Sequence, residues 1–116
     1  MESNQVIEIL AALAQDTRLQ AFKLLVKHEP EGVAAGELAR LLKVPQNTLS
    51  THLSILAQAG LVNGERQSRS IIYRANLDAV QGVVLHLLKD CCNGRPEFCK
   101  PLVAEITKSR SMKECC

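Results

Sequence analysis

Residues 35–60 read AGELARLLKVPQNTLSTHLSILAQAG, two short apolar patterns of helical period separated by the break Lys43-Val44-Pro45. In the first pattern, about 35–42, the inward residues are Leu38, Leu41 and Leu42. In the second, about 46–59, they are Leu49, Leu53 and Leu56. Gly60 follows directly and is typical of a helix end, because glycine adopts the left-handed conformation at little cost. The stretch therefore predicts two helices joined by a tight turn.

Three further helices are predicted around this pair. Val6–Ala14 carries apolar residues at helical spacing, and Asp16 is a suitable N-cap for a second helix that ends before the loop 29–32. The inward residues of that second helix are expected to be Leu19, Phe22, Leu25 and Val26. A last helix opens at residue 76 or 78 and extends to Cys91-Cys92.

After Gly60 the helical period gives way to two short β-rich segments. Residues 61–66 and 70–75 flank Gln67-Ser68-Arg69, which predicts a small hairpin. A helix pair with a tight turn, followed by a hairpin, makes a winged helix-turn-helix. The predicted fold is mainly α (α+β), with about five helices plus a two-stranded β-hairpin wing. We expect a single domain over residues 1–116 with a flexible C-terminal tail of about 100–116.

Length and composition exclude several classes of protein. The 116 residues, 47% apolar and 22% charged, suit one globular domain and not a disordered chain. No segment has the roughly 18 uncharged apolar residues of a membrane span, and the first residues lack the pattern of a signal peptide. Aromatic residues make up only 3%, which argues against stacking on single-stranded nucleic acid. We therefore expect a soluble, cytoplasmic protein whose cysteines, five in number and thus odd, are reduced.

The net charge of +2 is unevenly distributed along the chain. Residues 38–77 contain five basic side chains and one acidic side chain, Glu65, whereas acids outnumber bases in the rest. A surface that faces phosphates needs such a shortage of acids. On charge alone, a chance asymmetry of a solvated surface explains the pattern equally well.

The outward residues of the helix at 46–59 carry the main indication of function. They are polar and uncharged: Gln46, Asn47, Thr48, Ser50, Thr51 and Ser54. Amides pair with adenine edges and hydroxyls reach base edges or phosphates, so we predict DNA contact over the alternative of a neutral surface helix. The hairpin adds Arg66, Arg69 and Arg74, for each of which a solvated charge is an equal alternative. At the hairpin tip, Arg69 suits a narrow minor groove.

Several short motifs between about residues 8 and 90 occur in the order and spacing of a known family. They are Ala12-Leu13-Ala14, Asp16-Thr17-Arg18-Leu19, Glu37-Leu38-Ala39, Ser50-Thr51-His52-Leu53, Ala59-Gly60-Leu61-Val62 and Tyr73-Arg74. Together they resemble the ArsR/SmtB family of metal-responsive repressors. The resemblance implies a cytosolic homodimer on an imperfect inverted repeat of operator DNA, with bases read by the outward residues of the helix at 46–59.

The resemblance also assigns the first and last helices to the dimer interface. The residues we expect there are Val6, Leu10, Leu13, Val80, Val83, Val84 and Leu87. It places His52 near phosphate or base; a hydrogen-bonded packing residue is the alternative. Two metal sites used by members of the family lack ligands here. Ala34-Ala35-Gly36-Glu37 stands where one type carries Cys-x-Cys, and Asp78 and His86 lack the partners of a zinc site.

The cysteines indicate a different inducer site. Cys91, Cys92 and Cys99 lie in one short segment, and three thiolates suit a soft ion. Trivalent arsenic or antimony takes three sulfurs, whereas zinc prefers four ligands. The arrangement also resembles the arsenite site of another ArsR branch. Cys115 and Cys116 are expected to be accessory at most.

Alternatives remain for the thiols and for the chain as a whole. The thiols could be buried apolar groups, a redox switch, or ligands of cadmium or lead. The winged helix could instead serve protein contacts only. In that case the chain should show no preference for an inverted repeat of DNA. An enzyme is not expected, since the chain has no Ser/His/Asp set, Gly-rich phosphate loop or evident carboxylate pair. The best-supported prediction is a repressor released from operator DNA by As(III) or Sb(III).

Overall fold

The computed structural model describes residues 2–88, which contain five helices and three strands. In chain order these are α1 (Ser3–Leu13), α2 (Asp16–Lys27), β1 (Val33–Ala34), α3 (Ala35–Leu42), α4 (Gln46–Gln58), β2 (Val62–Gln67), β3 (Ser70–Ala75) and α5 (Leu77–Leu88). The chain divides into two compact units between Val83 and Val84, and every element except the end of α5 lies in the first. The expected course of α5 to Cys91-Cys92, like the expected tail, lies outside the described residues.

The helix pair has nearly the predicted bounds, and α4 ends one residue earlier than expected. Helix α3 covers Ala35–Leu42, and α4 ends at Gln58 with Gly60 in the left-handed region at φ 82°. The side chains of Leu38, Leu49, Leu53 and Leu56 are at most 1% exposed, which confirms the predicted inner faces around them. Lys43 in the turn also has a positive φ, 59°, and so ends α3 in the conformation that glycine usually supplies.

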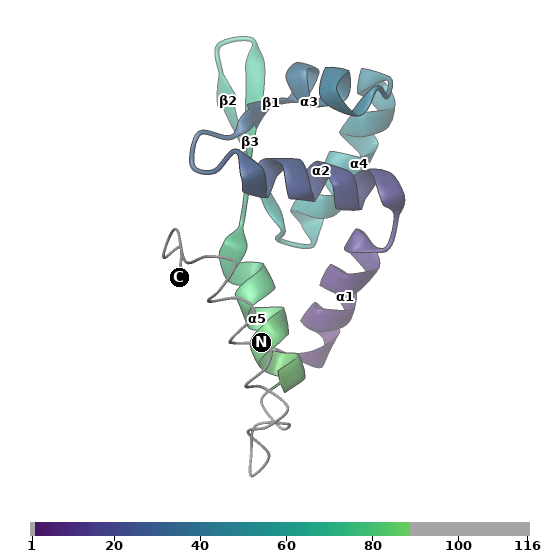
Figure 1. The fold of residues 1–116 in the computed structure, drawn as a ribbon, viewed down its shortest axis with the longest axis vertical. Helices are drawn as coiled ribbons and strands as arrows, with labels where there is room; N and C mark the ends of the chain where they lie inside the picture. Colours follow the sequence, from purple (N-terminus) through teal and green to yellow (C-terminus); the bar gives the residue numbers. More distant parts are fainter. Residues whose placement is uncertain (1, 89–116) are drawn as a thin grey trace. The chain divides into compact units, whose positions relative to one another are not determined.

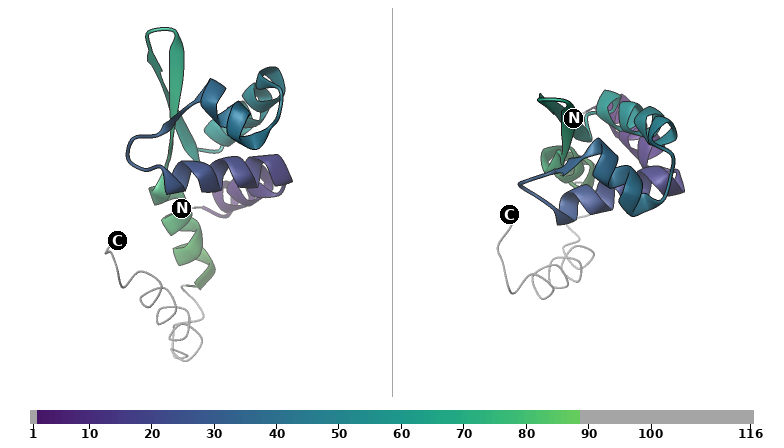
Figure 2. Two further views of the ribbon diagram at one scale, coloured as in Figure 1. Left: turned by 45° about the horizontal axis from the view of Figure 1, so that its top comes forward. Right: turned by 90° about the horizontal axis from the view of Figure 1, so that it is seen from above.

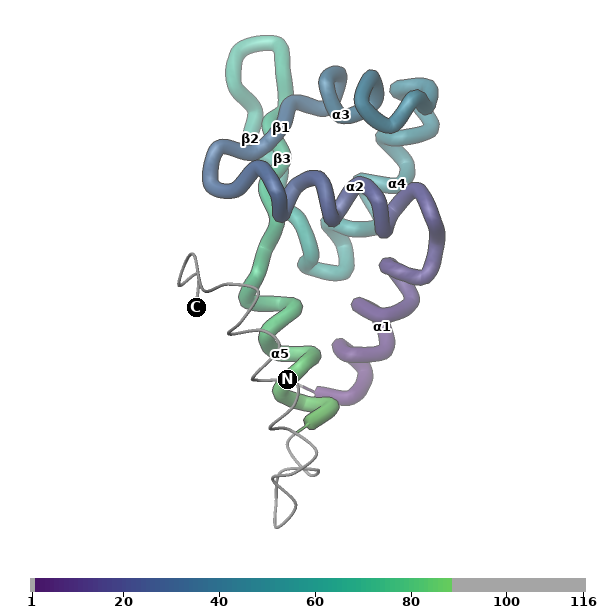
Figure 3. Tube along the Cα trace, viewed as in Figure 1, coloured from purple at the N-terminus to yellow at the C-terminus, as the bar shows by residue number. Residues whose placement is uncertain are grey.

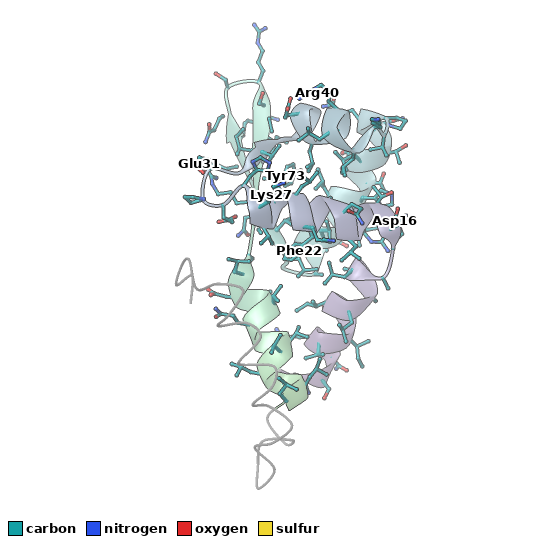
Figure 4. The ribbon with its side chains drawn as sticks, viewed as in Figure 1. Asp16, Phe22, Lys27, Glu31, Arg40 and Tyr73 are labelled. Atoms are coloured by element: carbon teal, nitrogen blue, oxygen red, sulfur yellow. The ribbon has the colours of Figure 1, made fainter. Side chains whose placement is uncertain are left out.

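Three predicted core residues are exposed. Leu19 and Leu41 are each 40% exposed and Val26 is 38% exposed. On a helix with 3.6 residues per turn, each lies roughly 100° from the centre of the strip that faces the core. The cores of α2 and α3 are formed instead by the buried residues Ala21, Phe22, Leu25, Leu38 and Ala39. Figure 4 shows Phe22 on α2 and Arg40 on the outer side of α3.

The predicted N-cap of α2 was wrong. Gln15 is the capping residue, and its side-chain oxygen accepts a hydrogen bond from the backbone nitrogen of Arg18 at 2.9 Å. Asp16 is the first helical residue, where a carboxylate still interacts favourably with the positive end of the helix dipole. The glutamine side chain is long enough to reach the third helical residue, so it takes the capping position from its neighbour.

The sheet contains the predicted hairpin and one strand that was not predicted. Strands β2 and β3 pair from Val62 with Ala75 to Gln67 with Ser70, leaving a two-residue turn. Strand β1 adds to the outer edge of β3 in the order β1-β3-β2, pairing Val33 with Tyr73 and Ala34 with Ile72. Figures 1 and 2 show the hairpin standing beside α3 and projecting past it. We call this β2–β3 hairpin, Val62–Ala75, the wing.

Within residues 2–88 no helix is both long and apolar enough to cross a membrane. The buried side chains of the first unit come from all of its helices and strands and form one cluster, and every one of them is apolar. The core therefore holds the helix pair and the base of the wing in one frame.

Replacing Gly32 with alanine should destabilise the fold more than replacing Gly60. Both glycines have a positive φ, 81° and 82°, so each alanine should cost about 1–2 kcal/mol of unfolding free energy. At Gly32 an added Cβ would also lie 2.6 Å from the carbonyl oxygen of Tyr73, whereas nothing lies within 4 Å of one at Gly60. We expect Gly32→Ala to lose at least about 1 kcal/mol more in urea unfolding. Equal losses would contradict the close approach of this loop to β3.

Candidate nucleic-acid interface

Helix α4 presents opposite faces to the core and to solvent. Its leucines are buried, and the outward residues predicted from the sequence are all exposed: Gln46, Asn47, Thr48, Ser50, Thr51 and Ser54. The helix begins after Pro45, which supplies no side-chain cap. The side-chain oxygen of Asn47 accepts from the backbone nitrogen of Thr48 at 2.9 Å, which leaves the amide nitrogen of Asn47 available to an external acceptor. The exposed face is thus rich in donors and free of carboxylates.

A groove of about 550 Å³ separates this face from the wing. Its walls come from the start of α3, the first half of α4 and the outer part of β3 with the wing tip. Among the lining residues are Gln46, Asn47, Ser50 and Arg69. The helix amides and the tip arginine therefore border the same opening.

In the part of the chain that the structure describes, one carboxylate borders the groove, and it is paired. Glu37 accepts a hydrogen bond from Arg40 Nε at 3.0 Å and a second from the same guanidinium. The hydrogen bonds with Arg40, together with its positive charge, lower the pKa of Glu37 below the ordinary value of 4.5, and the carboxylate raises the pKa of Arg40. The pair is exposed and adds little to stability. Its effect at neutral pH is to neutralise the acid beside α4.

The three arginines of the wing are not equivalent. Arg66 and Arg69 are exposed, and neither has an ion pair among residues 2–88. Arg74 instead donates to Glu65 at 2.8 Å and to the carbonyl oxygen of Pro30 at 3.1 Å. The prediction that Arg74 adds to a phosphate-facing surface is therefore not supported by its contacts.

His52 is half-buried and contacts an arginine that sequence reasoning did not single out. Arg18 Nη1 lies 3.4 Å from His52 Nδ1, and Arg18 Nε donates to the carbonyl oxygen of Ala12 at 2.6 Å. Arg18 thus links the end of α1 to α4. Its motif, Asp16-Thr17-Arg18-Leu19, was visible in the sequence, but nothing in its spacing indicated a partner 34 residues away. Arg18 is therefore a partner for His52 if that residue has a packing role. A DNA-binding role for His52 stays a prediction.

The predicted dimer residues differ in exposure. Val6 and Val83 are buried in the chain's own core, and Leu13 and Val80 are partly buried. Leu10, Val84 and Leu87 are 44%, 40% and 57% exposed. Ile7 and Leu85, which were not predicted, are 63% and 69% exposed. Of the seven predicted interface residues, Leu10, Val84 and Leu87 thus keep the most apolar surface for a partner chain.

The cysteines of the predicted inducer site lie outside the described residues: Cys91, Cys92 and Cys99, with the accessory pair Cys115 and Cys116. Within residues 2–88 no group of three or more His, Cys, Asp or Glu side chains is arranged to hold a metal. Asp78 and His86 lie on α5, and Ala34–Glu37 precedes and opens α3 without a cysteine.

Comparison with known proteins places this geometry among transcription factors. A family model described as a helix-turn-helix domain matches residues 13–65. The transcriptional activator HlyU of Vibrio cholerae is 33% identical over 92 residues, which cover 76% of this chain and 82% of HlyU. A structure of reduced HlyU is 31% identical with a TM-score of 0.60, covering 74% of this chain and 90% of that one.

Two mycobacterial proteins are also similar. The transcriptional repressor SmtB of Mycobacterium tuberculosis is 43% identical over 67 residues, 58% of this chain and about half (47%) of SmtB. The homodimeric winged helix-turn-helix DNA-binding domain Mb0332 of Mycobacterium bovis, a possible ArsR-family regulator, has a TM-score of 0.62. It is 28% identical and covers 76% of this chain and 81% of that chain. With its winged helix-turn-helix fold and these relatives, the chain belongs to the ArsR/SmtB family of transcriptional regulators.

Proposed function

We propose that the chain is a cytoplasmic transcriptional repressor that binds operator DNA as a homodimer and is released when As(III) or Sb(III) binds its cysteine thiolates. The observation that carries the DNA part is the juxtaposition of two surfaces. The acid-free polar face of α4 and the tip arginine Arg69 border one groove. The relatives that are described as a repressor and as a homodimeric DNA-binding domain support the same proposal.

In this proposal each recognition helix α4 enters a major groove and each wing follows the backbone. Asn47 and Gln46 supply amides for adenine edges, and Thr48, Ser50 and Thr51 supply hydroxyls for bases or phosphates. Arg66 and Arg69 supply the charge that phosphates or a narrow minor groove attract. Two-fold symmetry then requires an imperfect inverted repeat with half-sites about one helical turn, roughly 34 Å, apart. The exposed apolar residues Leu10, Val84 and Leu87 are available for the dimer contact.

The inducer part rests on ligand chemistry. Cys91, Cys92 and Cys99 offer three thiolates within nine residues, the donor set that a soft trivalent ion prefers. The described part of the chain provides no competing cluster of metal ligands. Cys115 and Cys116 add a second vicinal pair, which we regard as accessory.

Thiol oxidation is the second candidate signal. The observation that favours it is the relative HlyU, for which a form described as reduced has been solved. Vicinal thiols such as Cys91 and Cys92 are chemically able to be oxidised as well as to bind a soft ion. Cadmium or lead would use the same sulfurs, so a soft divalent ion and an oxidant are each compared with arsenite in the test of the cysteines.

The base-reading role of α4 predicts a difference between its residues and the wing. Replacing Asn47 or Thr51 with alanine should weaken binding to an operator duplex by about tenfold or more and leave random DNA nearly unaffected, because base contacts carry the specificity. Replacing Arg69 should weaken both and reduce the salt slope by about one unit. Fluorescence anisotropy on both duplexes at several salt concentrations measures this. Equal losses on all sequences for every variant would overturn the assignment.

The three-thiolate site predicts a sharp selectivity among the cysteines. Changing Cys91, Cys92 or Cys99 to serine should leave operator binding intact but abolish release by arsenite, since a hydroxyl is a poor ligand for a soft ion. The double change of Cys115 and Cys116 to serine is the matched control and should shift sensitivity modestly at most. Cadmium and hydrogen peroxide, titrated in parallel, identify the inducer. The assignment is wrong if the control alone removes induction while Cys99→Ser responds normally.

A further inference from the structure

Arg74 on β3 joins parts of the chain that are distant in sequence. Its Nη1 donates to the carboxylate of Glu65 on β2 at 2.8 Å, and its Nε donates to the carbonyl oxygen of Pro30 at 3.1 Å. The Arg74 side chain is only 33% exposed, against 63% for Glu65. The guanidinium therefore directs donors toward the protein and bridges the wing to the loop that follows α2.

The surrounding contacts hold the same loop against the same strand. A carboxylate oxygen of Glu29 accepts from the backbone nitrogen of Ala75 at 2.8 Å. Gly32 approaches β3 so closely that a Cβ would lie 2.8 Å from Arg74 Cγ. The tube in Figure 3 shows the chain leaving α2, turning, and returning as β1 along β3. Residues 29–34 thus pair with and hydrogen-bond to the outer edge of β3, and they hold the base of the wing in place.

Among the described residues, the outer part of the wing has no third strand beside it. Strand β1 ends its pairing at Ile72, and closer to the tip β3 pairs with β2 alone in this part of the chain. A two-stranded hairpin is marginally stable by itself. Arg69 lies three residues further along, roughly 10 Å away at the rise of a strand. The position of the tip therefore depends on how firmly the base is held.

The charges on the wing also indicate that Arg74 holds the hairpin and does not contact phosphate. Glu65 is the only acid in β2 and β3, and Arg74 neutralises it. If Arg74 turned to a phosphate, it would leave Pro30 without its donor and leave a free carboxylate beside the DNA. Arg66 and Arg69 can contact DNA without breaking any ion pair within residues 2–88.

We infer that Arg74 is a positioning residue for the wing: its bridge between Glu65 and Pro30 aims Arg69 at DNA, and Arg74 itself does not bind DNA. This inference rests on the proposed DNA binding for its functional consequence. Its structural consequence, an ordered wing tip, is independent of DNA.

A double-mutant cycle on a random-sequence 30-bp duplex at fixed low salt tests the inference. Arg69→Ala should weaken binding about tenfold in the wild-type chain, the loss expected for one charged contact, but less than about twofold in an Arg74→Gln background. Lys23→Gln is the control, because it also removes one positive charge but lies exposed on α2, away from the residues that line the groove. Arg69→Ala should keep its full tenfold effect there. Equal effects of Arg69→Ala in all three backgrounds would overturn the inference.

A second measurement needs no DNA. The ¹⁵N heteronuclear NOE of the Ser68 and Arg69 amides should fall in Arg74→Gln and stay at the wild-type value in Lys23→Gln. An unchanged NOE in both overturns the positioning role, whereas failure of the wild-type chain to bind any duplex overturns the proposed function alone.

If Arg74→Gln does not fold, Glu65→Gln removes the ion pair while keeping the Pro30 bond. The same two readouts should then shift in the same direction.

Discussion

The burial of one face of α4 is the constraint on which the rest of the interface depends. Leu49, Leu53 and Leu56 are essentially inaccessible to solvent, and they belong to the same buried cluster as residues of α2, α3 and the base of the wing. Because a helix is rigid, fixing these three side chains also fixes the opposite face outward. Leucine-to-alanine changes at such sites typically cost about 2–5 kcal/mol, so the orientation of the polar face is set by a large energy compared with any surface contact. Base reading by Asn47 or Thr51 requires that these leucines stay buried.

The wing is held in a different way, by polar contacts on its edge instead of by a deep core. Leu61, Val62 and Ala75 are buried at its base, but the outer residues are exposed. The Asn76 side chain donates to the carbonyl oxygen of Gly60 at 2.8 Å, and Asn76 N donates to Leu61 O at the same distance. Together with the bridge made by Arg74, these bonds tie the hairpin to the end of α4 and to the loop after α2. The helix and the wing thus keep a fixed relation across the groove.

Much of this could be predicted from the sequence, and the misses have physical causes. The bounds of α3 and α4 follow from the leucine period and the Pro45 and Gly60 boundaries, and the hairpin from its β-rich segments. Strand β1 has two residues, too few for any periodic pattern, and it exists because β3 offers an open edge. The contacts of Arg18 and Arg74 join residues 34 and 44 apart, which no local spacing reveals. The exposed polar face of α4 was predictable because it follows from the buried one, whereas the roles of individual arginines depend on tertiary neighbours.

We propose that inducer binding and operator binding are thermodynamically linked in one dimer. A coupling free energy of about 1–3 kcal/mol would lower operator affinity about 5- to 150-fold, and reciprocity requires operator DNA to weaken arsenite binding by the same factor. The most direct measurement is the arsenite affinity of the reduced protein, by isothermal titration calorimetry, with and without saturating operator duplex. With linkage, the arsenite affinity on DNA should be weaker by the same factor by which arsenite weakens DNA binding. Equal arsenite affinities in the two titrations would contradict it.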